Sequence, residues 1–63
     1  MKNNIYVIRK SKNLTLKELA SLTNLSVGYI CHLENGTRQN PSMSAMTKIC
    51  NALDKSLSEV FNI

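Results

Sequence analysis

The sequence predicts an all-α fold, a compact bundle of five short helices, on three observations. Apolar residues recur at three- and four-residue intervals, which places them on one face of a helix. A serine or threonine stands directly before four of these segments, where its side chain can accept a hydrogen bond from a free backbone N–H. No segment alternates apolar and polar residues as strongly. Because 63 residues provide one economical core, we expect a single domain over residues 1–63.

The first two helices are separated by a short break. The first is predicted over about residues 4–12, and residues 13–14 interrupt it. Thr15 then begins the second helix with a capping-box spacing, because Thr15 and Glu18 can each satisfy a free backbone N–H. The inward face of this helix is predicted to carry Leu19, Ala20 and Thr23.

The third helix is predicted over residues 27–34, with Ser26 as its N-cap. Its core pair is Ile30 and Leu33. The pair Asn35-Gly36 ends it, since glycine readily adopts the left-handed conformation of a helix C-terminus. A polar loop follows over residues 37–40 and is closed by Pro41.

The last two helices complete the bundle. Ser42 caps the fourth, and the spacing of its apolar residues predicts a core stripe made of Met43, Met46, Ile49, Cys50 and Leu53. Ser56 and Glu59 form a second capping-box pair. They begin a short final helix that ends at Val60-Phe61.

Charge is distributed unevenly along the chain. The formal net charge is +4, with +5 over residues 1–48 and −1 over residues 49–63. A basic body with a neutral-to-acidic end is typical of a surface that faces phosphates. A solvated basic surface without a nucleic-acid partner is the alternative.

Metal ligands are scarce, since Cys31, Cys50 and the single histidine, His32, cannot supply the four ligands of a structural zinc site. The first ten residues lack the apolar run of a signal peptide, and no run reaches the length of a membrane span. We therefore expect reduced thiols in a cytoplasmic protein. We expect no membrane segment, metal, cofactor or small-molecule ligand.

Residues 15–36 predict a helix-turn-helix motif, two helices of about eight residues joined by a turn of about three. Ala20 is small enough for the two helices of the motif to cross closely. Leu25 fills the space under the turn, while Ile30 and Leu33 anchor the helix over residues 27–34 to the core. The N-terminal half of that helix is left exposed, as in motifs that enter the major groove of DNA.

From Ile5 to about Phe61 the chain resembles the Cro and lambda-repressor class (XRE-type) of helix-turn-helix domains. The matching residues are Ile8-Arg9, Leu14-Thr15, Lys17-Glu18-Leu19-Ala20, Leu25-Ser26, Tyr29-Ile30, Leu33-Glu34-Asn35-Gly36, Pro41-Ser42 and Ile49-Cys50-Asn51-Ala52-Leu53. The resemblance implies binding to double-stranded DNA, by a small transcriptional repressor that occupies an operator.

The resemblance also implies roles for individual residues. Arg9 and Glu34 correspond to a structural ion pair between the first and third helices. Base readers correspond to Val27, Gly28, Cys31 and His32. Contacts to the DNA backbone correspond to Thr15, Leu16, Lys17, Ser26, Asn35, Thr37, Arg38, Gln39 and Asn40. Ser26 is interpreted first as the helix cap and second as a phosphate contact.

Several residues depart from the family pattern. Val27 and Gly28 stand where relatives usually have a side chain that can form hydrogen bonds with bases, and neither can make a bidentate bond to one. Leu16 and Leu22 also replace polar residues, so they and Val27 can form an apolar surface. This surface favours an alternative function, a protein-interaction module such as an antitoxin-like or antirepressor-like adaptor. Gly28 indicates either a close approach to a partner or neutral drift.

Two further expectations concern assembly and catalysis. A homodimer on two half-sites is expected, paired through the C-terminal residues Leu57, Val60, Phe61 and Ile63, although some of these must also close the core of the single chain. An enzyme is not expected, because four carboxylates and one histidine provide no nucleophile beside a base. Cys31 and His32 are adjacent, so on a helix they point about 100° apart.

Overall fold

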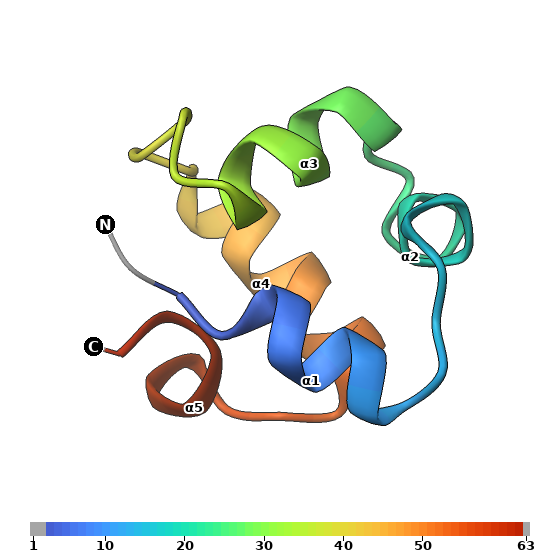
Figure 1. The fold of residues 1–63 in the computed structure, drawn as a ribbon. Coiled ribbons are helices and arrows are strands. Elements are labelled where there is room, and N and C mark those ends of the chain that lie inside the picture. Colours follow the sequence, from blue (N-terminus) through green and yellow to red (C-terminus); the bar gives the residue numbers. More distant parts are fainter. Residues whose placement is uncertain (1–2, 63) are drawn as a thin grey trace.

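The computed structural model describes residues 3–62, which form five α-helices without a strand in that part of the chain (Figure 1). The helices are α1 (Ile5–Ser11), α2 (Leu16–Thr23), α3 (Val27–Glu34), α4 (Met43–Leu53) and α5 (Leu57–Phe61). The predicted all-α bundle of five short helices is confirmed. Only α1 is shorter than predicted, because residues 4 and 12 are its caps and not part of the helix.

Serine or threonine begins each helix from α2 to α5, as predicted. The hydroxyl of the N-cap residue accepts a hydrogen bond from the backbone N–H three residues further on, in the pairs Thr15–Glu18, Ser26–Tyr29, Ser42–Ala45 and Ser56–Glu59. Both predicted capping boxes, at α2 and α5, are complete. A cap of this kind stabilises a helix by about 1 kcal/mol. Short polar side chains therefore fix where the helices start.

Left-handed residues end most of the helices. Asn24, Asp54 and Asn62 have φ angles of 59°, 56° and 58°, and Gly36 has φ of 83° just after α3. Asn and Asp tolerate this conformation better than other non-glycine residues, and glycine adopts it without steric cost. The predicted end of the third helix at Asn35-Gly36 is confirmed.

The core is shared by all five helices. The largest fully buried side chains are Ile5, Leu19, Ile30, Leu33, Ile49, Leu53, Val60 and Phe61. Helix α2 packs against α3 and α4, and α5 packs against α4 and α1. Helix α3 lies along one edge of the molecule, with α5 at the opposite edge (Figure 1). None of the helices within residues 3–62 combines the length and the apolar character needed to cross a membrane.

Two predictions about apolar residues are wrong. Met43 was expected in the core stripe of the fourth helix, but it is the first residue of α4 and its side chain is 59% exposed. Val60 and Phe61 were expected at a dimer surface, but both are buried in the core of the single chain. Leu57 also packs against this core. Ile63, the remaining residue of that predicted surface, lies outside the described residues.

Candidate nucleic-acid interface

The α2–turn–α3 unit has the packing that the sequence predicts. Ala20 is nearly inaccessible where the two helices meet, and Leu25 packs on the core beneath the turn. Ile30 and Leu33 are fully buried. Because the face of α3 with Ile30 and Leu33 packs in the core, its opposite face is exposed to solvent.

The four candidate base readers lie on α3 but differ in exposure. Val27, Gly28 and His32 are exposed, whereas Cys31 is half-buried. A Cβ atom added to Gly28 would meet no atom of residues 3–62 within 4 Å, so no contact in this part of the chain requires a glycine there. Val27 offers methyl groups and His32 an imidazole N–H. The N-terminal half of this surface is therefore poor in hydrogen-bonding groups.

Two candidate backbone contacts, Thr15 and Ser26, are helix caps. Their hydroxyl oxygens accept backbone N–H groups at 3.0 Å from Glu18 and Tyr29, respectively. A hydroxyl also carries one hydrogen, which it can donate elsewhere. Ser26 is therefore a helix cap, as its first interpretation states. Its hydroxyl hydrogen is not used by the cap and can be donated to another acceptor.

The loop after α3 is folded back onto the end of that helix. The backbone N–H of Arg38 donates to the carbonyl of His32 at 3.0 Å. The side chain of Asn35 accepts the N–H of Thr37 at 2.9 Å, and Gln39 Nε2 donates to the carbonyl of Gly36 at 3.2 Å. Residues 37–40 are all exposed. The predicted backbone contacts of this loop are therefore grouped beside the C-terminal half of α3.

Sequence reasoning missed a contact between Tyr29 and this loop. The guanidinium carbon of Arg38 lies 4.8 Å from the centre of the Tyr29 ring, within the range of a cation–π contact. The nine-residue separation gives no helical periodicity to detect. The available signal was the Asn35-Gly36 turn, because a chain that reverses there returns alongside the helix it has just left.

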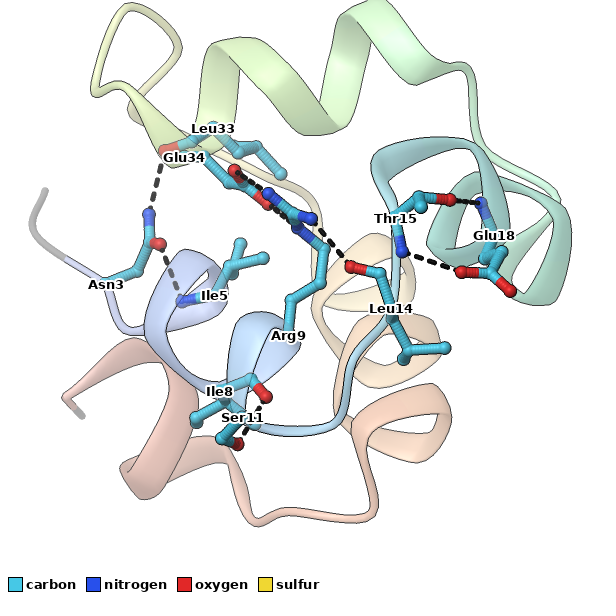
Figure 2. A network of polar contacts seen from close by, with 10 residues as sticks. All are labelled: Asn3, Ile5, Ile8, Arg9, Ser11, Leu14, Thr15, Glu18, Leu33 and Glu34. Carbon is cyan, nitrogen blue, oxygen red and sulfur yellow. Dashed lines mark hydrogen bonds and ion pairs between the residues drawn. The ribbon is translucent and has the colours of Figure 1, made fainter.

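Arg9 and Glu34 form the expected ion pair (Figure 2). Arg9 Nε and Nη2 donate to the two carboxylate oxygens of Glu34 at 2.7 and 3.1 Å, and Nη1 donates to the carbonyl of Leu14 at 2.7 Å. Arg9 is buried, and the hydrogen bond with Glu34 raises the pKa of Arg9 above its usual value. The pair fixes the last residue of α3 to α1 and to the connection between α1 and α2.

A second contact to the same end of α3 was not predicted. Asn3 Nδ2 donates to the carbonyl of Leu33 at 2.9 Å, while Asn3 Oδ1 accepts the N–H of Ile5 (Figure 2). The next residue, Asn4, donates its N–H to the carbonyl of Val60 at 2.7 Å. The segment before α1 therefore connects the C-terminal end of α3 with α5.

The predicted apolar surface is smaller than expected. Leu22 and Val27 are 62% and 42% exposed, in agreement with the prediction. Leu16, in contrast, packs against the core and is half-buried, so it does not belong to an exposed patch. Lys17, the neighbouring candidate for a phosphate contact, is exposed. Within residues 3–62 no three His, Cys, Asp or Glu side chains are grouped as metal ligands.

Comparison with known proteins agrees with this geometry. Residues 5–60 match the family model described as helix-turn-helix. The chain is 31% identical over 58 residues to the HTH-type transcriptional regulator SlrR of Bacillus subtilis, covering 92% of this chain and 38% of that protein. It is 38% identical over 52 residues to the transcriptional regulator ClgR of Mycobacterium tuberculosis, covering 82% of this chain and 46% of that protein. The chain spans less than half the length of these relatives.

A solved structure is similar over most of both chains. The restriction-modification controller protein C.AhdI from Aeromonas hydrophila superposes with a TM-score of 0.83 and 32% sequence identity. The match covers 89% of this chain and 83% of that one. The two proteins therefore share the all-helical, helix-turn-helix fold.

Proposed function

This chain belongs to the helix-turn-helix family, and from that premise we propose that it binds double-stranded DNA as a small transcriptional repressor that occupies an operator. The relatives are named as transcriptional regulators, and the solved neighbour as a controller protein. The match to the family model covers residues 5–60, which includes the whole α2–α3 unit. Family membership therefore supports the class of function, and the interface supports its mechanism.

The proposed mechanism of DNA binding rests on one feature of the structure. Helix α3 is held at its C-terminal end, while its outer face is exposed. Arg9 and Asn3 hold Glu34 and Leu33, and the loop beside them presents Arg38 to solvent. A helix held in this way can lie in a major groove while the loop contacts phosphates. Most of the affinity then comes from phosphate contacts, which carry no sequence information themselves.

We also propose that two copies act on two half-sites about one helical turn apart. A single α3 of eight residues spans only a few base pairs, and two of its candidate base readers, Val27 and Gly28, form no hydrogen bonds with bases. Val60 and Phe61 are excluded as the pairing surface by their burial. Sedimentation of the free and the DNA-bound protein measures the number of copies.

A protein-interaction adaptor is the second candidate, and one observation favours it. Leu22 and Val27 are exposed on either side of the turn between α2 and α3, where a partner protein can cover them. Such an adaptor has no need of an exposed arginine in the loop after α3. The effect of removing Arg38 therefore separates the two functions.

The test starts from a random pool of duplexes, so that no operator sequence has to be assumed. The duplex enriched by the protein is titrated against a scrambled control at about 50 and about 200 mM salt. The repressor proposal predicts that the enriched duplex binds at least about a thousandfold tighter than the control. Equal, weak binding of both duplexes would contradict it and favour the adaptor.

Arg38→Ala refines this test. Loss of one phosphate contact should weaken binding to all duplexes alike and reduce the slope of log affinity against log salt by about one unit. Lys55→Ala is the matched control, because Lys55 belongs to the connection between α4 and α5 and its ion pair with Glu59 is exposed. This connection lies far from α3 (Figure 1). An identical change of slope in both variants would remove Arg38 from the interface.

A further inference from the structure

The contact between Tyr29 and Arg38 joins two parts of the candidate interface. Tyr29 is in the first turn of α3, and Arg38 is in the loop that follows this helix. The guanidinium lies over the ring at 4.8 Å from its centre. A cation in this position is attracted by the negative face of the ring. The flexible end of the arginine side chain is thus held by α3 itself.

The two residues are fixed at their backbones as well. Tyr29 donates its N–H to the Ser26 cap and packs partly against the core. Arg38 donates its N–H to the carbonyl of His32 at 3.0 Å. The arginine is therefore attached to α3 at both ends of its side chain, once through the backbone and once through the ring.

The edge of the guanidinium stays available while its face is covered. The ion pairs found within residues 3–62 use Arg9 and Lys55, so no carboxylate in this part of the chain neutralises Arg38. A planar guanidinium can stack on a ring and at the same time donate hydrogen bonds along its edge. Its geometry fits a phosphate with two acceptor oxygens.

We propose that Tyr29 is a positioning residue that orders Arg38 before DNA arrives, so that a backbone phosphate is bound in fixed register with His32. This role rests on the proposed function, since it requires DNA as the ligand. An arginine that is already ordered loses less side-chain entropy on binding than a free one. Because the same ring belongs to α3, it also sets the distance between the phosphate contact and a candidate base reader.

The first test is a double-mutant cycle on a scrambled duplex of about two helical turns, where phosphate contacts dominate. Tyr29→Leu should weaken binding roughly threefold to tenfold, the loss expected when one long side chain must be ordered on binding. Tyr29→Phe keeps the ring and should restore binding to within about twofold of the unsubstituted protein. On the Arg38→Ala background, Tyr29→Leu should cause no further loss.

Tyr6→Leu is the matched control. Tyr6 is an exposed tyrosine whose ring lies 5.3 Å from the guanidinium carbon of Arg9, so it makes the same kind of contact outside the interface. Its substitution should leave the coupling between positions 29 and 38 unchanged. Thermal unfolding of every variant checks the fold, and Tyr29→Met replaces Tyr29→Leu if the latter unfolds. The proposal is overturned if removing the ring weakens binding equally with and without Arg38, or not at all.

The second test needs no DNA. In the free protein, the ring current of Tyr29 should shift the side-chain NMR signals of Arg38, and the shift should persist in Tyr29→Phe and disappear in Tyr29→Leu. A missing shift together with normal DNA binding would overturn the positioning role and leave the proposed function intact. A protein that shows the shift but binds no duplex would contradict the proposed function, and the role of Tyr29 in DNA binding with it.

Discussion

The two ends of α3 differ sharply in how they are held. At the C-terminal end, Glu34 accepts two hydrogen bonds from Arg9, and the carbonyl of Leu33 accepts one from Asn3. At the N-terminal end, Ser26 caps the helix by accepting the N–H of Tyr29, and a Cβ atom on Gly28 would meet no atom of residues 3–62 within 4 Å. One end of the same eight-residue helix is fixed by hydrogen bonds to other segments. At the other end the outward residues Val27 and Gly28 are open, and Tyr29 contacts the core and Arg38 instead.

This difference separates two tasks that a DNA-binding helix performs. The fixed end stands beside the loop with Arg38 and other donors, where phosphate contacts set the position of the protein on the duplex. The open end carries Val27 and Gly28, which form no hydrogen bonds with bases. We therefore expect binding that is well positioned on the DNA backbone and depends strongly on salt. Discrimination between bases then depends on His32, on methyl contacts and on DNA shape.

The largest effect is expected when the ion pair that holds the C-terminal end of α3 is removed. Glu34→Ala leaves the buried charge of Arg9 without its partner, so we expect the free energy of unfolding to fall by about 3–5 kcal/mol. Denaturation by urea measures it. The double variant Arg9→Met with Glu34→Leu removes both charges and should recover most of the loss. A loss below about 1 kcal/mol in Glu34→Ala, typical of an exposed pair, would contradict the assignment.

The second-largest effect is expected when a side chain that can form hydrogen bonds with bases is added to the N-terminal end of α3. Val27→Gln introduces an amide that can form a bidentate pair with adenine, which should add about 1–3 kcal/mol of discrimination at one base pair. Affinities for duplexes that differ at single positions measure this preference. Leu22→Gln is the control, since it makes the same change of polarity at an exposed residue of α2. Equal preferences in the two variants would place Val27 outside the groove.

A smaller effect concerns the stability of the open end. Gly28→Ala removes a flexible residue from α3 where the new methyl group meets no neighbour. We expect the free energy of unfolding to rise by up to about 1 kcal/mol. Thermal unfolding checks it, and unchanged or reduced stability would mean that this end is not open. Weaker binding of the enriched duplex by the stabilised variant would assign Gly28 to a close approach of DNA, and unchanged binding to neutral drift.

The smallest effect is expected at the N-terminus of α5, where the charged carboxylate of the capping box contributes to the stability of the fold. Hydrogen bonds from Ser56 hold the pKa of the Glu59 carboxyl below 4.5, its ordinary value. Because the folded pKa is the lower one, the charged form stabilises the fold above pH 4.5, and this contribution is lost as the pH falls through the folded pKa. The melting temperatures of the parent and of Glu59→Gln should therefore differ near neutral pH and converge in acid. A constant difference would contradict this.

Local chemistry made most of the fold predictable from the sequence. The four Ser or Thr caps and the Asn35-Gly36 turn act through hydrogen bonds within a few residues, so their positions in the chain reveal them. Val60 and Phe61 were misplaced because an apolar end of a chain looks the same whether it closes its own core or covers a partner. Burial depends on how the helices pack, and spacing within one helix does not determine it.

The candidate site was predictable only in part, for the same reason. The exposed face of α3 follows from helical periodicity, and the family resemblance supplied the Arg9–Glu34 pair. The contacts of Asn3 with Leu33 and of Tyr29 with Arg38 join segments 30 and nine residues apart through geometry that no local pattern encodes. The assignments of individual DNA contacts stay predictions.

Binding of DNA by α3 and the loop after it is tested by NMR, following backbone amide signals while a duplex is added at low salt. We expect the largest changes at the N-termini of α2 and α3, along the outer face of α3 and in residues 35–40. The amides of α5 and of the connection before it should change little. Changes concentrated at Leu22 and α5, or none in residues 35–40, would show that DNA does not bind at α3 and this loop.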